Sequence, residues 1–85
     1  MSLSEIGKSA FWACYGIKYI DLPSYVKRIE PYAFCLCSNM EYLFLDKYVD
    51  DVDYNAFDDC KNLKSALIHK HTDLGDDVFN DCPNF

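Results

Sequence analysis

The chain has 85 residues, of which 51% are hydrophobic and 26% are charged, a balance that excludes a disordered chain and an integral membrane protein. Its net charge is −6, and the whole excess lies in residues 43–85, where ten Asp accompany four Lys. Because an acidic surface repels phosphate groups, we expect no nucleic acid as a partner, and a basic protein face or a cation suits this charge better. The same charge also fits a solvated surface without a partner.

The N-terminus and the apolar runs bear on the compartment of the protein. Residues 1–5 lack the basic and apolar regions of a signal peptide. No apolar run reaches the roughly 18 residues of a membrane-spanning helix, so we expect no membrane insertion. The protein either stays inside the cell or follows a leader that lies upstream of this sequence.

A motif of Ala or Val, then Phe, then Cys three residues after the Phe occurs four times. The first copy is Ala10, Phe11 and Cys14, and the later copies follow at spacings of 23, 23 and 22 residues. A fixed period of this length is typical of a solenoid, in which one supersecondary unit is repeated in tandem. We therefore predict a single solenoid domain over residues 1–85, with repeats starting near 6, 29, 52 and 74.

Aligned repeats place apolar residues at about eight equivalent positions in each unit. Such columns predict the side chains that point into a shared core. The columns with a member in every repeat are Ile6, Ile29, Val52 and Leu74; Ala10, Ala33, Ala56 and Val78; Phe11, Phe34, Phe57 and Phe79; Cys14, Cys37, Cys60 and Cys82; and Ile17, Met40, Leu63 and Phe85.

Each repeat begins with a segment that predicts a turn and ends with one that predicts a strand. In the second repeat, Pro31 suits the first position of a helix, and Ala33 and Cys37 are spaced to share one face of a helical or 3₁₀ turn. Further on, Leu43 and Leu45 are separated by one residue, the period of a strand with one buried face.

Residues 26–30 fit a second short extended segment between the strand and the next turn. The predicted fold is therefore an α/β repeat solenoid of three to four units of 22 to 23 residues. It has a short parallel sheet on one side and short helical or 3₁₀ turns on the opposite side.

One column holds Gly16, Asn39, Asn62 and Asn84 and predicts a backbone role. Gly and Asn best tolerate a positive φ, which indicates a left-handed turn before the strand. The alternative is that each Asn side chain forms a hydrogen bond with the backbone of the neighbouring repeat. The sequence does not separate these two interpretations.

In order and spacing, these columns resemble the BspA-like leucine-rich repeats, whose units read approximately I-G-x-x-A-F-x-x-C-x-x-L-x-x-I-x-L-P followed by V. The first repeat matches at Ile6, Gly7, Ala10, Phe11, Cys14, Ile17, Ile20, Leu22, Pro23 and Val26. Departures are Glu30 and Asp53 in place of Gly, Asp46 and His69 in place of Pro, and the small Ala66 in a strand. They affect the expected shape of the loops and leave the expected fold unchanged.

The resemblance implies a leucine-rich-repeat fold. The family includes surface proteins of bacteria and protist parasites that bind host matrix proteins or other cells. It therefore implies cell-surface adhesion or host-protein binding, and a surface or secreted location. A cytoplasmic location is the alternative.

The cysteines fit a buried column better than a disulfide scaffold. Cys14, Cys37, Cys60 and Cys82 share one core column, where Cys acts as a small hydrophobic residue, so we expect reduced structural thiols. Equivalent positions in neighbouring repeats lie within disulfide range, and oxidation is the alternative. Cys35 belongs to a mostly polar column, and we expect its side chain to be more exposed than the other four.

Two motifs contain residues of the types that bind metal ions, and neither is predicted to hold one. His69 and His71 offer two imidazoles on one extended segment, but structural zinc usually takes four ligands. Residues 51–55 resemble the start of a calcium loop, but Ala56 stands where that loop needs Gly and Asn62 stands where it needs Glu. We predict no metal and no cofactor.

Outward positions on the predicted strands carry unusually apolar residues. The alternation places Tyr19, Tyr42, Phe44 and Leu67 on the outer face of the sheet. Aromatic residues inside a polar rim are typical of a protein-binding surface. The alternative is that loops, a neighbouring chain or further repeats cover these four residues.

The ends of the array are open, since repeats of a solenoid bury their faces against one another. We therefore expect a fragment of a longer array, or self-association through an exposed end in which a following unit or a partner buries Phe85. The predicted function is non-enzymatic protein–protein interaction through the strand face, with no catalytic residues. Alternatives are an intracellular scaffold or structural segment using the same face, and a metal or thiol site around Cys35 or His69 and His71.

Overall fold

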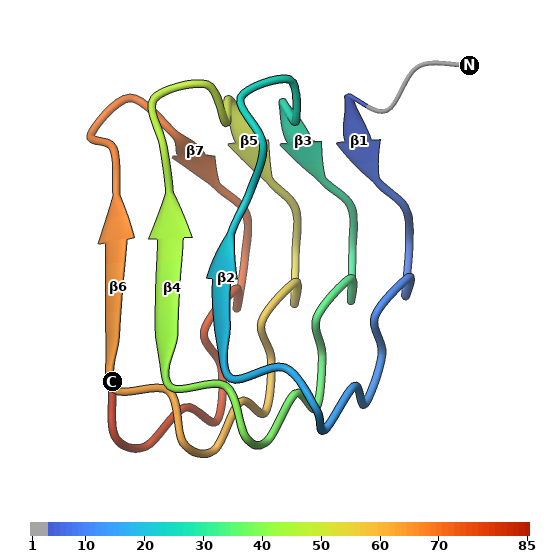
Figure 1. Ribbon diagram of the computed structural model, residues 1–85, viewed down its shortest axis with the longest axis vertical. Coiled ribbons are helices and arrows are strands. Elements are labelled where there is room, and N and C mark those ends of the chain that lie inside the picture. Colours follow the sequence, from blue (N-terminus) through green and yellow to red (C-terminus); the bar gives the residue numbers. More distant parts are fainter. Residues whose placement is uncertain (1–3) are drawn as a thin grey trace.

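Each of the first three repeats adds one strand to each of two parallel sheets, the fourth adds a strand to one of them, and the chain winds from one sheet to the other and back (Figure 1). The computed structural model describes residues 4–85. One sheet has the order β1-β3-β5-β7 and the other has the order β2-β4-β6. The strands of the first sheet are β1 Glu5–Ile6, β3 Arg28–Ile29, β5 Asp51–Val52 and β7 Asp73–Leu74, and those of the second are β2 Tyr19–Asp21, β4 Tyr42–Leu45 and β6 Ser65–Ile68.

The strand register follows the repeat period found in the sequence. Tyr19 pairs with Tyr42, and Tyr42 pairs with Ser65, so that equivalent residues of successive repeats lie side by side. In the other sheet, Val52 pairs with Leu74, which shows that the shorter last spacing is absorbed without loss of register. The predicted parallel sheet and the predicted second extended segment at 26–30 are confirmed, the latter as β3.

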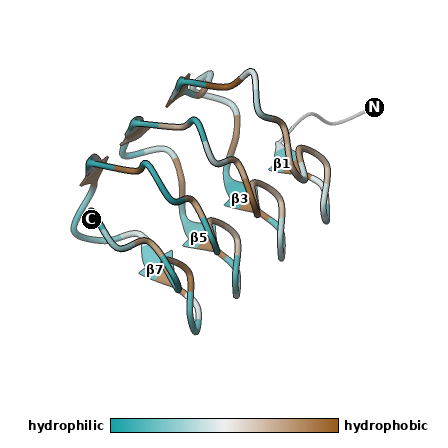
Figure 2. Cartoon of the chain, turned by 90° about the horizontal axis from the view of Figure 1, so that it is seen from below, coloured by the Kyte–Doolittle hydropathy of each residue, from teal (hydrophilic) through white to brown (hydrophobic). Residues whose placement is uncertain are grey.

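The inward residues of both sheets and of the turns form one core. The alternation of hydrophilic and hydrophobic residues recurs in each winding of the chain (Figure 2). A side chain in the middle of the array is covered by its equivalents on both sides, and this explains why the second and third repeats contain the most buried residues. The largest fully buried side chains are Phe57, Ile29, Met40, Leu43, Leu45, Leu63, Val49, Val52, Cys37 and Cys60.

The phenylalanine column is a continuous stack of rings on the turn side of the core. The ring centroids of Phe11 and Phe34 lie 5.1 Å apart, those of Phe34 and Phe57 5.2 Å, and those of Phe57 and Phe79 5.8 Å. The Phe85 ring packs against Phe79 at 4.5 Å and is 51% exposed. Burial of Phe85 by a following unit or a partner stays a prediction.

The predicted helical or 3₁₀ turns are not confirmed, because within residues 4–85 the corresponding segments are successive turns without a helix. The Cys35 N–H donates to the Tyr32 carbonyl in its own repeat, but the neighbouring Phe34 N–H donates to Ala56 in the next repeat. Tyr32 and Leu36 have φ values of 60° and 61°, which a right-handed helix excludes. Alternate N–H groups therefore join neighbouring repeats and are unavailable for a helix.

The predicted left-handed column is wrong. Positive φ occurs at other positions, and the column of Gly16, Asn39, Asn62 and Asn84 has none. The alternative role is confirmed for Asn39 and Asn84, whose amide nitrogens donate to the carbonyls of Tyr15 at 2.7 Å and Lys61 at 3.1 Å in the preceding repeat. The residues with positive φ are Ser9, Tyr32, Asn55 and Asp77, and Ala13, Leu36, Asp59 and Asp81.

Two residues near the one-residue deletion between the third and fourth repeats each make a close contact with the preceding repeat. Thr72 is buried at the position of Val49 in the preceding repeat, and its hydroxyl donates to the Val49 carbonyl at 2.8 Å. Three residues later, a Cβ atom on Gly75 would lie 2.8 Å from the backbone nitrogen of Tyr54. Only glycine allows the segment after β7 to pass this close to the third repeat.

Candidate protein-interaction surface

The four residues predicted for partner binding lie together on the outer face of the β2-β4-β6 sheet. Tyr19 is 70% exposed, Tyr42 50%, Phe44 53% and Leu67 59%. Tyr19 pairs in register with Tyr42, and Phe44 pairs with Leu67, so the four form two adjoining columns. We call these four residues the strand-face patch.

The alternation of β4 explains why its aromatic side chains face solvent. Leu43 and Leu45 are buried in the core, and the pleat turns Tyr42 and Phe44 to the opposite face. Neighbouring parallel strands lie about 4.8 Å apart, which brings the outward side chains of successive repeats into contact distance. The sheet therefore holds the strand-face patch on a rigid surface.

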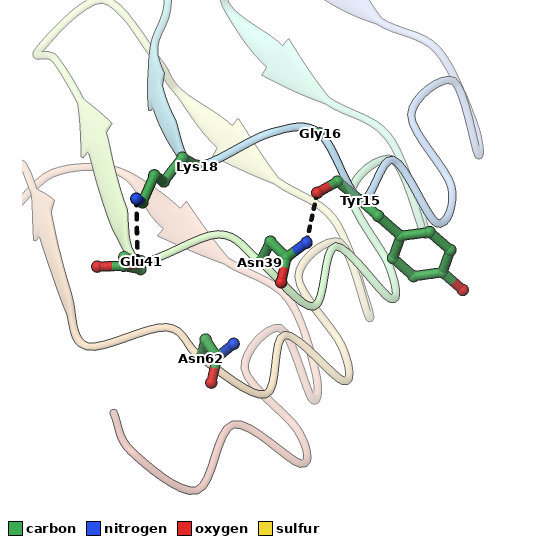
Figure 3. A pocket seen from close by; sticks show the side chains of 6 residues that line it. All are labelled: Tyr15, Gly16, Lys18, Asn39, Glu41 and Asn62. Atoms are coloured by element: carbon green, nitrogen blue, oxygen red, sulfur yellow. Dashed lines mark hydrogen bonds and ion pairs between the residues drawn. The ribbon is translucent and has the colours of Figure 1, made fainter.

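A polar cavity of about 330 Å³ lies where the chain turns from the stacked turns into the second sheet (Figure 3). Glu41 stands between two lysines of its column, with carboxylate to ammonium distances of 3.9 Å to Lys18 and 3.3 Å to Lys64. The amide of Asn39 points to the Tyr15 carbonyl above it. These contacts give the strand-face patch a charged rim at the start of the strands.

A second groove, of about 410 Å³, lies at the other end of the same strands. Among its apolar lining residues, Phe44 and Leu67 are the ones with exposed side chains. Sequence reasoning missed this groove, although the signal was present: Lys47 and Lys70 stand at equivalent positions within an acidic half of the chain. The residues that line it are Phe44, Leu45, Asp46, Lys47, Leu67, Ile68, His69 and Lys70.

The five cysteines are free thiols, and three of them donate hydrogen bonds. Cys37, Cys60 and Cys82 donate to the carbonyl of the Phe in the preceding repeat, at Sγ–O distances of 3.2, 3.3 and 3.2 Å. Burial raises the pKa of the Cys37 thiol. Cys is thus both a small core residue and a donor between repeats, a role that the sequence did not indicate.

The prediction that Cys35 is the most exposed cysteine is wrong, because its side chain is only 4% exposed. It belongs to an interior repeat, where the residues of the adjacent repeats cover a side chain as small as a thiol. Burial, together with the negative charges of Asp58 and Asp59, raises the pKa of Cys35 to about 11. A thiol that stays protonated at neutral pH is a poor nucleophile.

The two motifs with metal-binding residue types have other partners. The rings of His69 and His71 have their centroids 4.1 Å apart, and His71 Nε2 lies 2.8 Å from the Lys47 carbonyl oxygen. Asp53 accepts the Tyr54 N–H at 2.9 Å and pairs with an arginine. Over residues 4–85, no group of three or more His, Cys, Asp or Glu side chains is placed to hold a metal ion.

Comparison with known families agrees with the geometry of the repeats. The family model described as "BspA type Leucine rich repeat region (6 copies)" matches residues 1–85. No curated protein and no solved structure matches the chain. In the described part of the chain, no helix is long and apolar enough to cross a membrane. Because the match covers the whole sequence, the chain belongs to the BspA-type leucine-rich repeat family.

Proposed function

We propose that the chain is a non-enzymatic module that binds a protein through the strand-face patch. The observation that carries this proposal is the position of Tyr19, Tyr42, Phe44 and Leu67, which lie in register and half or more exposed on strands that bury most of their inward residues. Aromatic and aliphatic anchors on a rigid surface, with charged residues around them, have the composition of an interface.

The burial of three of the thiols, those of Cys35, Cys37 and Cys60, supports a non-enzymatic role. The Cys35 thiol is buried and its pKa is raised to about 11. Cys37 and Cys60 are buried and donate to backbone carbonyls. An activated cysteine nucleophile has the opposite properties, namely a lowered pKa and access to substrate.

Family membership supports cell-surface adhesion or host-protein binding as the context, with the protein at the cell surface or secreted. The alternative is an intracellular scaffold or a structural repeat segment that uses the same face. Surface biotinylation of intact cells that express the protein separates the two. Labelling of the protein supports adhesion, whereas labelling only after lysis supports the scaffold.

The test of the strand-face patch is the double variant Tyr42→Ala and Phe44→Ala. A partner recovered with the wild-type chain by crosslinking should lose affinity for this variant by about 100-fold, since central aromatic residues dominate binding energy. The matched control is Tyr15→Ala with Tyr25→Ala, which removes two aromatic side chains of similar exposure outside the patch. Retained binding by a folded double variant would contradict the proposal.

We also propose that the isolated chain self-associates through the ends of the solenoid. On the turn side, the Phe11 N–H donates to the Ala33 carbonyl in the following repeat. Beside the strands, the Asp53 N–H donates to the Ile29 carbonyl in the preceding repeat. This polarity makes the two ends complementary for head-to-tail stacking. Sedimentation should give a weight-average mass that rises with concentration, and a concentration-independent monomer would contradict this proposal.

A further inference from the structure

The groove at the ends of β4 and β6 combines an apolar column with a basic column. Phe44 and Leu67 occupy equivalent positions in successive repeats and pair in register. Lys47 and Lys70 are likewise separated by one repeat, and both line the same groove. Two columns of different chemistry therefore run side by side along the solenoid axis.

The basic column is not neutralised by its surroundings. Lys70 forms no ion pair with residues 4–85, and the ammonium of Lys47 lies 5.5 Å from the centroid of the Tyr48 ring without an acidic partner among the same residues. Asp46, the one acid that lines the groove, accepts the Lys47 backbone N–H at 2.6 Å. By contrast, Lys18 and Lys64 at the opposite end of the strands share Glu41.

The first repeat limits where this chemistry occurs. The residue that pairs with Phe44 on β2 is Asp21, and the equivalent of Lys47 in that repeat is Ser24. The apolar and basic columns thus begin at β4, and they meet a carboxylate at the first repeat. Lys47 and Lys70 attract an acidic ligand, whereas Asp21 repels it at the end nearest the first repeat. The two effects together orient the ligand.

We propose that this groove binds an extended peptide segment that alternates apolar and acidic side chains, with the apolar groups on Phe44 and Leu67 and the carboxylates at Lys47 and Lys70. Charge complementarity selects this occupant, because an apolar surface beside two ammonium groups that lack ion pairs with residues 4–85 matches a carboxylate-bearing chain. The inference rests on the proposed function, since it uses part of the strand-face patch and names the chemistry of the partner.

The test uses fluorescein-labelled synthetic peptides at low ionic strength, followed by fluorescence anisotropy. The probes are the acetylated and amidated pentapeptides Glu-Leu-Glu-Leu-Glu, Lys-Leu-Lys-Leu-Lys and Glu-Ser-Glu-Ser-Glu. The first should bind at least 10-fold more tightly than either of the others, because it alone supplies both the apolar and the acidic groups. Equal binding of the acidic and basic peptides, or no binding of the first peptide, would overturn the inference.

Charge reversal gives a matched comparison. The variant Lys47→Glu with Lys70→Glu should bind the lysine peptide in preference to the glutamate peptide. The control Lys8→Glu with Lys27→Glu changes the net charge equally at exposed sites outside the groove and should retain the wild-type preference. An equal loss of glutamate-peptide binding in both variants would overturn the inference. Asp21→Asn should strengthen binding of the glutamate peptide, and a weakening would also count against it.

The natural partner separates this inference from the proposed function. If the partner loses affinity for Tyr42→Ala with Phe44→Ala but binds Lys47→Glu with Lys70→Glu normally, the strand face is the interface and the charge preference is wrong. If the affinity of the partner is unchanged by Tyr42→Ala with Phe44→Ala, the proposed function fails. The peptide selectivity of the groove is then judged by the anisotropy data alone.

Discussion

The strand side and the turn side of each repeat cover the same core, but they place different demands on their outward residues. On the strand side, outward positions such as Tyr42 and Phe44 need only an extended backbone. On the turn side, Asp59, Asp77 and Asp81 have φ values of 63°, 56° and 54°, which favour Asp, Asn or Gly. Outward residues of the turns are therefore selected in part by the backbone, and those of the strands are not.

This difference changes how the net charge of the chain is understood. Three of the ten Asp residues in positions 43–85 occupy positive-φ positions of the turns, so a conformational need explains their presence. The exposed aromatic residues of the strand side have no such explanation. This contrast is a reason to propose the strand face, in preference to the acidic turns, as the surface that binds a partner.

The largest expected effect is loss of a ring from the turn-side stack. Phe57 is fully buried between Phe34 and Phe79, and Phe57→Ala should lower the free energy of unfolding by about 3 to 5 kcal/mol. Urea denaturation followed by circular dichroism measures the change. The strand-side control Phe44→Ala removes an exposed ring and should change stability by about 0.5 kcal/mol or less. Equal losses in both variants would contradict the assignment of core and surface.

Two glycines of one column provide a matched test of backbone packing. A Cβ atom on Gly75 would lie 2.8 Å from the Tyr54 nitrogen, whereas at Gly7 it would meet nothing within 4 Å. Gly75→Ala should destabilise the chain by about 1 to 3 kcal/mol, and Gly7→Ala should be neutral or slightly stabilising. Thermal unfolding of the two variants compares them directly. Similar melting temperatures would show that the backbone around Gly75 and Tyr54 shifts to make room for the methyl group.

The hydroxyl of Thr72 gives a test of the junction between the third and fourth repeats. Thr72→Val keeps the shape of the side chain but leaves the buried Val49 carbonyl without this donor, which should cost about 1 to 3 kcal/mol. Thr72→Ser retains the donor and should lose less stability than Thr72→Val. The urea midpoints of the two variants measure this difference. A lower midpoint for Thr72→Ser than for Thr72→Val would show that packing of the methyl group contributes more than the hydrogen bond.

The smallest effect concerns the Cys35 thiol. Its pKa is raised from 9.0 to about 11, so the folded state favours the neutral thiol. This contribution to stability is complete below pH 9 and is lost as pH rises through 9 toward 11. Cys35→Ala should therefore reduce the fall in the urea midpoint between pH 8 and pH 10. If the variant and the wild type show identical slopes, Cys35 is not buried as described.

Much of the fold follows from the sequence because the core columns and the pleat are both periodic. The alternation at Leu43 and Leu45 was sufficient to place Tyr42 and Phe44 on the outer face. The turns were not predictable in the same way, because Tyr32 and Leu36 disfavour the left-handed region they adopt. Hydrogen bonds to the next repeat impose that conformation, and these contacts are visible only once the repeats are stacked.

The candidate surface was only partly accessible from the sequence for a similar reason. Tyr19 and Leu67 could be placed on the face from alternation alone. The burial of Cys35, and the lack of an ion pair at Lys70 with residues 4–85, depend on what neighbouring repeats and loops contribute. Properties set within one repeat were predicted well, whereas properties set between repeats required the structure.

Site-specific photocrosslinking tests most directly the claim that the strand side is the interaction surface. A benzoylphenylalanine residue in place of Phe44 lies on the strand side, and the same residue in place of the exposed Tyr54 lies on the turn side. We predict that the partner is crosslinked from position 44 and not from position 54. Crosslinking from position 54 alone would contradict the claim and move the interface to the turns.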